Sequence, residues 1–269
     1  MRPQASATMP HRDPKTLAFQ RVNGNFALTM LAGYAMPYGS VPRLLVSWVT
    51  SEAKRTKERQ LVLGQSLSDF MRELGLRITG GQRGDITRLK EQATRLFSTS
   101  ISCVVREPGR SVEIKNLQIA DTAKIWWDPK NPEQLGLWPS TVMLSENFFQ
   151  EVTERPVPVD LRAIAALKQS PLALDIYCWL TYRMSYLQGT SRPIPWPSLQ
   201  VQFGAGYATD AQGTRDFKKA FLRELKSVLT VYPRARVELD RRGLVLKESP
   251  THVSIAVPAL WEQGKLPLA

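Results

Sequence analysis

The sequence predicts a helix-rich α+β fold made of two similar halves. Apolar residues recur at helical spacing in several segments of each half. Short β-rich runs, separated by turn residues, follow the helices. The order of these elements is the same in both halves, and two parallel patterns are much less easily produced by accident than one. The shared order therefore indicates a weak internal duplication.

The first half contains predicted helices followed by a hairpin. We expect helices over about residues 41–57, 66–74 and 85–98, and strands over 100–106 and 112–119. The third helix follows a glycine-rich turn at 80–84, with Asp85 as its expected N-cap. The two strands are joined by a turn at 107–110 that contains proline and glycine. Helix, turn, helix and hairpin is the order of a winged-helix domain.

The second half repeats this order after a strand at 141–144 and two short helices, whose expected caps are Ser145 and Asp160. The further elements that we expect are a long helix from 171, helices at 197–203 and 214–232, and strands at 236–239 and 244–248 around the turn 240–243. The predicted fold class is therefore two tandem winged-helix domains, each with a helix-turn-helix and a β-hairpin wing.

A proline-containing segment between the halves predicts the domain junction. Pro129 and Pro132 remove backbone donors there, and Asn131 and Gly136 favour turns. The expected division is a flexible N-terminal tail at 1–20, a first domain at 21–128, a junction at 129–136, a second domain at 137–255 and a C-terminal tail at 256–269.

The charge of the chain favours a nucleic-acid partner. Lysine and arginine total 36 against 24 acidic residues, which gives a formal net charge of +12. A membrane partner is disfavoured because the basic residues are spread along the chain and charged residues or prolines interrupt each apolar stretch. The first twenty residues lack the apolar core of a signal peptide, and the two cysteines have no CxxC spacing. We therefore expect a protein of the cytosol.

The helix expected at 85–98 has a polar face opposite its apolar stripe. Arg88, Gln92 and Arg95 lie together on that face, and Thr87 flanks it. Arginine can pair with guanine and glutamine with adenine, so these three residues are candidates for base reading, and Arg83 in the preceding turn joins the predicted DNA-binding set. The alternative interpretation is an ordinary solvated helix face.

The helix expected at 214–232 also carries a basic face. Asp216 and Glu224 are its only carboxylates, too few to pair with its basic residues. Its predicted DNA contacts are Arg215, Lys218, Lys219, Arg223 and Lys226. Arg110 in the first hairpin turn, and Arg241 and Arg242 in the second, are expected to reach the DNA backbone or minor groove. The alternative for these three is a role in solubility.

The sequence lacks the marks of an enzyme. The glycine-rich turn at 80–85 has no Gly-Lys-Ser/Thr ending, so it does not form a phosphate-binding P-loop. His11 and His252 are the only histidines and lie far apart, and no acidic cluster suggests a two-metal site. We expect no catalytic, cofactor or metal site. The tryptophans adjoin apolar or proline-rich stretches, which favours packing in the core or between domains for Trp126, Trp127, Trp138, Trp179 and Trp196.

Two motifs give a family resemblance. The stretch Ile-Trp-Trp-Asp-Pro at 125–129 through Leu-Trp-Pro-Ser at 137–140, and the run Ser-Pro-Leu-Ala-Leu-Asp-Ile-Tyr at 170–177 followed by Trp179 and Leu180, resemble plasmid-encoded RepA replication initiators. The resemblance runs from about Phe26 to Val253. It implies a cytosolic bacterial protein, bound to plasmid DNA, that binds repeated origin sites called iterons and helps to melt adjacent AT-rich DNA. It also implies recruitment of the host initiator and replicative helicase, and a monomer–dimer equilibrium that serves copy control.

Two other functions fit the same residues. A plasmid or phage transcriptional repressor would share the fold without a helicase-loading partner, and an assembly protein would use its basic surface to bind an acidic partner. We expect the two predicted recognition helices to enter successive major grooves, which would cover roughly 20 base pairs of double-stranded DNA.

Overall fold

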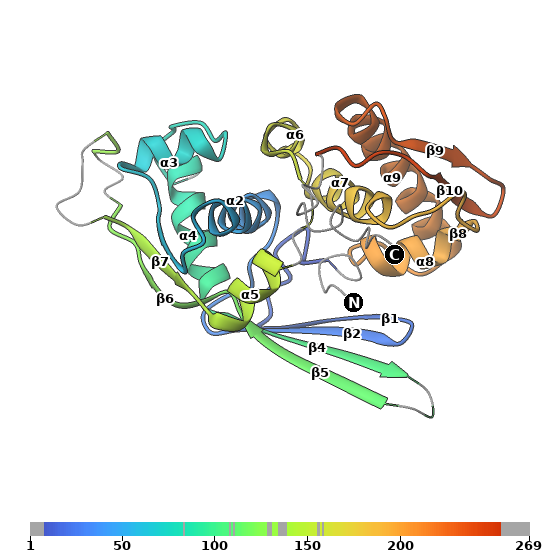
Figure 1. The fold of residues 1–269 in the computed structure, drawn as a ribbon, viewed down its shortest axis with the longest axis horizontal. Coiled ribbons are helices and arrows are strands. Elements are labelled where there is room, and N and C mark those ends of the chain that lie inside the picture. The colour runs from blue at the N-terminus through green and yellow to red at the C-terminus, as the bar shows by residue number, and fades with distance from the viewer. Residues whose placement is uncertain are drawn as a thin grey trace, which may run out of the picture.

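A computed structural model describes residues 8–82, 84–107, 109, 111–127, 131–133, 139–154, 157 and 159–253. These residues form eight helices and three antiparallel sheets, a mixed α/β fold. Figure 1 shows two groups of helices side by side, with one long sheet running below them. Among the described helices, none is both long enough and apolar enough to cross a membrane.

The first half consists of four helices and a small sheet. Its elements are α2 (Ser40–Thr56), β3 (Gln60–Val62), α3 (Leu67–Glu73), α4 (Asp85–Phe97), β6 (Ala120–Lys124), β7 (Thr141–Leu144) and α5 (Glu146–Glu154). The three strands pair in the order β3-β7-β6. Phe70 is fully buried between Trp48 and Trp127, with ring centroids 4.9 and 5.6 Å away. These aromatic contacts fix α3 against α2.

The second half has the same architecture. Its elements are α6 (Leu161–Leu167), α7 (Pro171–Met184), β8 (Ile194–Pro195), α8 (Trp196–Phe203), α9 (Ala211–Val231), β9 (Arg236–Leu239) and β10 (Gly243–Lys247). Helix α7 begins at Pro171, where Ser170 accepts a hydrogen bond from the Ala173 amide. It is apolar on most sides because it packs against α9, α6 and α2.

The two halves repeat one topology. In each half, a helix is followed by a short strand, two further helices and a pair of strands, and in the first half β4 and β5 come between the last helix and this pair. The last of the three strands lies in the middle of the sheet in both, as the orders β3-β7-β6 and β8-β10-β9 show. The repeated element order that the sequence predicts is therefore present, although one of the two hairpins is not the expected one.

The long sheet consists of four strands, in the order β1 (Ala18–Asn23), β2 (Phe26–Ala32), β4 (Thr99–Glu107) and β5 (Ser111–Gln118). The sequence analysis predicted β4 and β5 but assigned them to the first wing, and this assignment is wrong. Strand β4 pairs with β2 from Thr99 to Val105, and Phe26, Leu28 and Met30 of β2 form a small core with Cys103. The hairpin that joins the sheet of the first half is β6–β7 instead.

The expected domain junction at 129–136 also needs correction. Lys124 of β6 pairs with Thr141 of β7, so the intervening chain connects two strands of one sheet. Strand β7 also pairs with β3, which places residues 141–144 in the first half and not in the second. Of the expected junction, residues 129, 130 and 134–136 lie outside the described part of the chain, as does the C-terminal tail at 256–269.

The expected N-terminal tail is partly packed. Thr8 and Pro10 are buried, and β1 begins within the segment assigned to the tail. Strand β1 pairs with β2 through the two-residue turn at Gly24 and Asn25, in which Gly24 adopts a φ of +61° that glycine tolerates best. The remaining tail residues, 1–7, lie outside the described residues.

Candidate nucleic-acid interface

Helix α4 starts at a turn that only glycine can form. A Cβ at Gly84 would lie 2.3 Å from the carbonyl oxygens of Thr79 and Gly80, so no larger residue fits without a shift of the backbone. Gly84 is the N-cap, and Asp85, the expected cap, is the first helical residue. Asp85 instead forms an ion pair of 3.1 Å with Arg88 one turn later. This turn sets the angle at which α4 leaves the loop.

The exposed face of α4 differs from the predicted one. Arg88 is exposed, with 56% of its side chain accessible, and Lys90, Glu91 and Thr94 are exposed beside it. Thr87 is half-buried, and its hydroxyl donates a 2.8 Å hydrogen bond to the Gly81 carbonyl. The face is therefore mixed in charge, with two basic residues and one acidic residue.

Gln92 and Arg95 do not lie on this exposed face, and the prediction that they face outward with Arg88 is wrong. Gln92 is buried, and its Oε1 accepts a 2.9 Å hydrogen bond from the Tyr38 amide. Arg95 is 9% exposed, donates to the Met36 carbonyl at 3.1 Å and stacks on the Tyr38 ring. The segment 36–38 covers this side of α4, which a helical wheel of α4 alone cannot reveal.

Charge partners hold Arg95 in place. Its guanidinium forms ion pairs with Glu91 and, at 3.5 Å, with Asp13. Burial disfavours the charged form, but the hydrogen bond to Glu91 and the two carboxylates outweigh it, so the pKa of Arg95 is raised. Arg95 is thus a structural residue in the free protein.

Helix α9 presents a wide basic face. Its N-cap Asp210 accepts a 2.6 Å hydrogen bond from the Gly213 amide. Its apolar stripe is buried against the other helices of the second half. The apolar stripe contains Phe217, Phe221, Leu225 and Val228. At about 100° per residue, Arg215, Lys219 and Lys226 fall within about 40° of one another on the opposite side. All three are exposed.

Few carboxylates neutralise this face. Arg223 is exposed and forms a 2.7 Å ion pair with Glu224, and Lys218 lies over the Trp196 ring at 4.7 Å. Arg215 donates to the Gln212 side chain at 2.8 Å. Within the described part of the chain, no carboxylate forms an ion pair with Arg215, Lys219 or Lys226. The structure therefore brings five predicted residues together on one helix and leaves most of their charge uncompensated.

The β9–β10 turn carries two exposed arginines. Arg241 and Arg242 are both exposed, and Arg242 contacts Asp240 through its amide at 2.8 Å and its Nε at 3.2 Å. The hydrogen bond from the Arg242 amide lowers the pKa of Asp240 most, and the hydrogen bond from the Arg242 side chain lowers it further. The predicted residues Arg83 and Arg110 lie outside the described residues. The strands on either side of position 110, β4 and β5, belong to the long sheet.

The sequence analysis missed a second exposed group, at the end of β6. Trp126 is 61% exposed beside exposed Lys124, whereas Trp127 is buried. Packing in the core or between domains, predicted for all five tryptophans, is not observed for the exposed Trp126. Trp127, Trp179 and Trp196 are buried, and Trp138 lies outside the described residues. Neighbouring side chains of an extended chain point to opposite faces, and this signal could have separated Trp126 from Trp127.

The described residues contain no group of three or more histidine, cysteine, aspartate or glutamate side chains arranged to hold a metal ion.

The different environments of Arg88 and Arg95 give a prediction about stability. Arg95→Ala should lower the free energy of unfolding by about 1–3 kcal/mol, because it leaves the Met36 carbonyl and the Glu91 carboxylate without their donor. Arg88→Ala is the matched control and should change it by less than about 0.5 kcal/mol, because the side chain is exposed. Urea denaturation followed by circular dichroism measures both. Equal stability of the two variants would contradict the structural role of Arg95.

The chain is similar in structure to proteins of known structure. Two crystal structures of domains 2 and 3 of RctB are similar to it. The first, of selenomethionine derivatives, has a TM-score of 0.56 at 11% identity and covers 89% of this chain and 94% of that chain. The second, of RctB residues 155–483, has a TM-score of 0.49 at 10% identity and covers 88% and 95%. The first similarity shows a shared fold. Among curated proteins, no match was found.

A family model described as plasmid encoded RepA protein matches residues 36–196, which is more than half of the chain. This range begins just before α2, spans the first half and extends through α7 to the start of α8. It contains both motifs on which the family resemblance rested. The chain belongs to the family of plasmid-encoded RepA replication initiators.

Proposed function

We propose that this initiator binds repeated double-stranded sites in a plasmid origin through two winged-helix units. The observation that carries this proposal is the uncompensated basic face of α9, at the third-helix position of a topology that occurs twice. Phosphate contacts by such a face supply affinity, and contacts to base edges supply specificity. The same position in the first half is occupied by α4.

The sheet orders support two winged-helix units. In each half, the short strand before the helix pair lies beside the last strand. The hairpin of the last two strands would form the wing. Helices α3 and α4 would form one helix-turn-helix and α8 and α9 the other. In such a unit the second helix of the pair enters the major groove. Two units in one chain would cover about two helical turns of DNA.

The two units contribute unequally to this binding mode. Helix α9 offers Arg215, Lys219, Arg223 and Lys226 to phosphates and bases. Helix α4 offers Arg88 with Thr87 and Lys90, and Gln92 and Arg95 are not included because they are buried. Arg241 and Arg242 extend the contact at the second wing.

The first wing adds an aromatic contact. Trp126 and Lys124 are exposed at the end of β6, on the hairpin that corresponds in topology to the one carrying Arg241 and Arg242. An exposed ring beside a positive charge suits stacking on bases or insertion into the minor groove. We assign Trp126 this role.

The remaining steps follow from family membership. The protein would bind iterons, promote melting of adjacent DNA and recruit the host initiator and replicative helicase, without catalysing a reaction itself. It would act in the bacterial cytosol on plasmid DNA, with a monomer–dimer equilibrium that contributes to copy control. The free energy of binding would offset the free energy of DNA deformation, which is on the order of 1–6 kcal/mol per site.

Substitutions on α9 and α4 test the binding mode. Lys219→Ala should weaken binding to all duplexes and reduce the slope of log K against log salt by about 0.9, because one phosphate contact is lost. Arg88→Ala should cost about 1–3 kcal/mol on a duplex selected by the wild-type protein from a random pool, and little on random DNA. Salt titrations of fluorescence anisotropy on both duplexes measure these effects.

Lys54→Ala, an exposed lysine at the end of α2, is the matched control and should leave both quantities unchanged. An unchanged salt slope for Lys219→Ala would remove α9 from the interface. An equal loss on selected and random duplexes for Arg88→Ala would remove Arg88 from base reading.

The first wing has its own test. Trp126→Ala should lose about 1–3 kcal/mol of binding to the selected duplex, because a stacking or groove contact disappears. Its unfolding free energy should change little, because the side chain is exposed. Val112→Ala, which removes an exposed apolar side chain from β5, serves as control. Unchanged DNA affinity of Trp126→Ala would exclude the first wing from the contact.

An origin assay separates an initiator from a transcriptional repressor of the same fold. The gene is supplied in trans to a plasmid that carries only the selected repeats and the adjoining DNA. We expect this plasmid to replicate with the wild-type gene and to fail with a Lys219→Ala, Lys226→Ala double variant. Tight binding of the repeats without replication of the plasmid would favour the repressor.

A further inference from the structure

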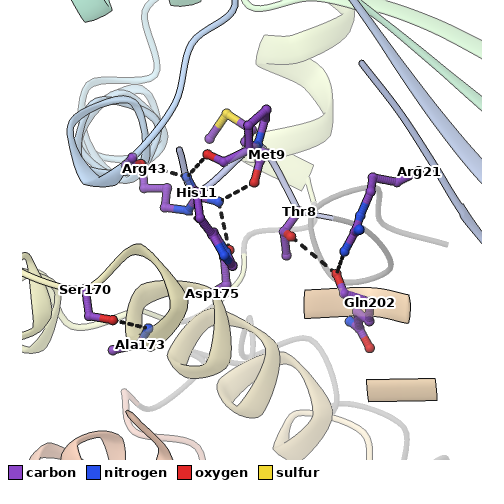
Figure 2. A network of polar contacts seen from close by, with 11 residues as sticks. Thr8, Met9, His11, Arg21, Arg43, Ser170, Ala173, Asp175 and Gln202 are labelled. Atoms are coloured by element: carbon purple, nitrogen blue, oxygen red, sulfur yellow. Dashed lines mark hydrogen bonds and ion pairs between the residues drawn. The ribbon is translucent and has the colours of Figure 1, made fainter. Parts of the chain in front are cut away.

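Helix α7 carries a carboxylate, with only 12% of its side chain exposed, that the proposed DNA contacts do not explain. Asp175 lies in the apolar run of this helix, and Figure 2 shows Arg43 of α2 and His11 directed at its carboxylate. Arg43 Nε lies 2.7 Å from Asp175 Oδ1, and a second guanidinium nitrogen lies 2.8 Å from Oδ2. His11 Nε2 lies 2.7 Å from Oδ2. The charge therefore joins the N-terminal segment and both halves.

The partners of Arg43 are complete. An arginine has five N–H donors, and each of those of Arg43 has an acceptor. Two reach Asp175, and the other three reach the carbonyl oxygens of Met9 at 2.7 Å, Pro10 at 3.3 Å and Gly39 at 2.7 Å. Because Arg43 is only 6% exposed, loss of any acceptor would leave a buried donor without a partner. Arg43 thus ties the backbone at 9–10 to α2 and α7.

The same short segment also contacts α8 and α4. Thr8 donates a hydrogen bond of 3.3 Å to the Gln202 carbonyl of α8, which also accepts one of 2.8 Å from Arg21 of β1 (Figure 2). Asp13 forms the 3.5 Å ion pair with Arg95 of α4. Residues 8–13 therefore contact both halves, including one candidate recognition helix and the helix before the other.

These contacts differ from those of an ordinary apolar core. Burial raises the pKa of Asp175, but Arg43 and His11 outweigh it, and the pKa is lowered, so the carboxylate is charged. A buried ion pair adds little net stability compared with apolar side chains of similar size, whereas its fixed geometry can specify one arrangement. Such a group suits the positioning of two halves better than their stabilisation.

We propose that residues 8–13, together with Arg43 and Asp175, form a clasp that fixes the two halves at the spacing at which α4 and α9 bind DNA together. Their effect on spacing preference rests on the proposed function, whereas their effect on the arrangement of the halves does not. Arg43, His11 and Asp175 are positioning residues, because they act through α4 and α9. Two DNA contacts in one chain strengthen binding only when both can be made at the same time. A fixed distance between α4 and α9 therefore produces a preference for one spacing between the two half-sites.

The first experiment measures the arrangement without DNA. Spin labels on Glu58→Cys and Gln188→Cys, both at exposed positions, report the distance between the halves. Burial raises the pKa of Cys103 to about 11 and that of Cys178 to about 12, so both native thiols should react slowly. The wild-type chain should give one narrow distance distribution. Removal of residues 1–13 should broaden it at least about twofold.

A second variant guards against loss of folding. Arg43→Met with Asp175→Leu replaces the ion pair by apolar side chains of similar size, which is often neutral for stability. It should retain the helical circular dichroism of the wild type and a cooperative thermal transition, with a midpoint lowered because the Met9, Pro10 and Gly39 carbonyls lose their donor. It should show the same broadening. Arg12→Ala, an exposed residue of the same segment, is the matched control and should leave the distribution narrow.

The second experiment measures spacing preference. Duplexes carry the selected site with zero or two base pairs inserted at its centre, which turns one half-site by about 70° relative to the other. The wild type and Arg12→Ala should lose on the order of 100-fold in affinity on the insertion. The clasp variants should bind the original site roughly tenfold more weakly and lose less than about tenfold on the insertion.

The outcomes are distinguishable. Narrow distances and unchanged spacing preference in folded clasp variants would overturn the clasp. Broadened distances with an unchanged spacing preference would overturn its role in positioning the two DNA contacts. Failure of the wild type to bind any duplex would reject the proposed function, while the distance measurement would still decide whether the clasp fixes the halves.

Discussion

The two halves share one apolar core, and one ion pair, between Arg43 and Asp175, gives their contact a fixed polar geometry. A carboxylate inside an apolar helix is unfavourable unless its charge is compensated, and here the compensating group comes from the other half of the molecule. Helix α2, which carries Arg43, also contacts α4 and α5 in its own half and α6 and α7 in the other. The ion pair therefore lies at the helix that links the two units. The N-terminal segment completes it, which explains why residues with a tail-like composition are packed.

Helices could be predicted closely from the sequence, because their periodicity and caps are local. The predicted bounds of α4 and the predicted start of α7 agree with the structure to within one residue. The main difference is at α9, which begins at Ala211 and includes Gly213 in its first turn, where a Cβ would lie 2.1 Å from the Ala208 carbonyl oxygen. The predicted helix began at 214, one residue after this glycine. Strand pairing was less predictable because it is nonlocal: β4 was placed correctly, but its partner β2 lies about seventy residues away in sequence.

The candidate site shows the same division between local and nonlocal information. The basic face of α9 could be predicted because a single apolar stripe faces the core and nothing among the described residues covers the other side. The face of α4 could be predicted only in part, because a second segment, at 36–38, covers Gln92 and Arg95. A helical wheel shows where the apolar stripe lies, but not whether a distant loop packs on the polar side. Trp126 was missed for a related reason, since composition around a tryptophan does not say which of two neighbours faces the core.

In the proposed binding mode, the unequal charge of α4 and α9 affects how the two units would share one DNA site. The basic face of α9 can attract any duplex, but charge alone cannot select a register along the DNA. The face of α4 carries Arg88 beside Glu91 and attracts phosphate less strongly. It is better suited to discriminate between bases, because the carboxylate repels negatively charged or acceptor groups at a wrong site. Attraction by α9 and base discrimination by α4 act together at one DNA site only if the distance between the two helices is fixed. Contacts between the halves therefore belong to the recognition problem as much as the exposed arginines do.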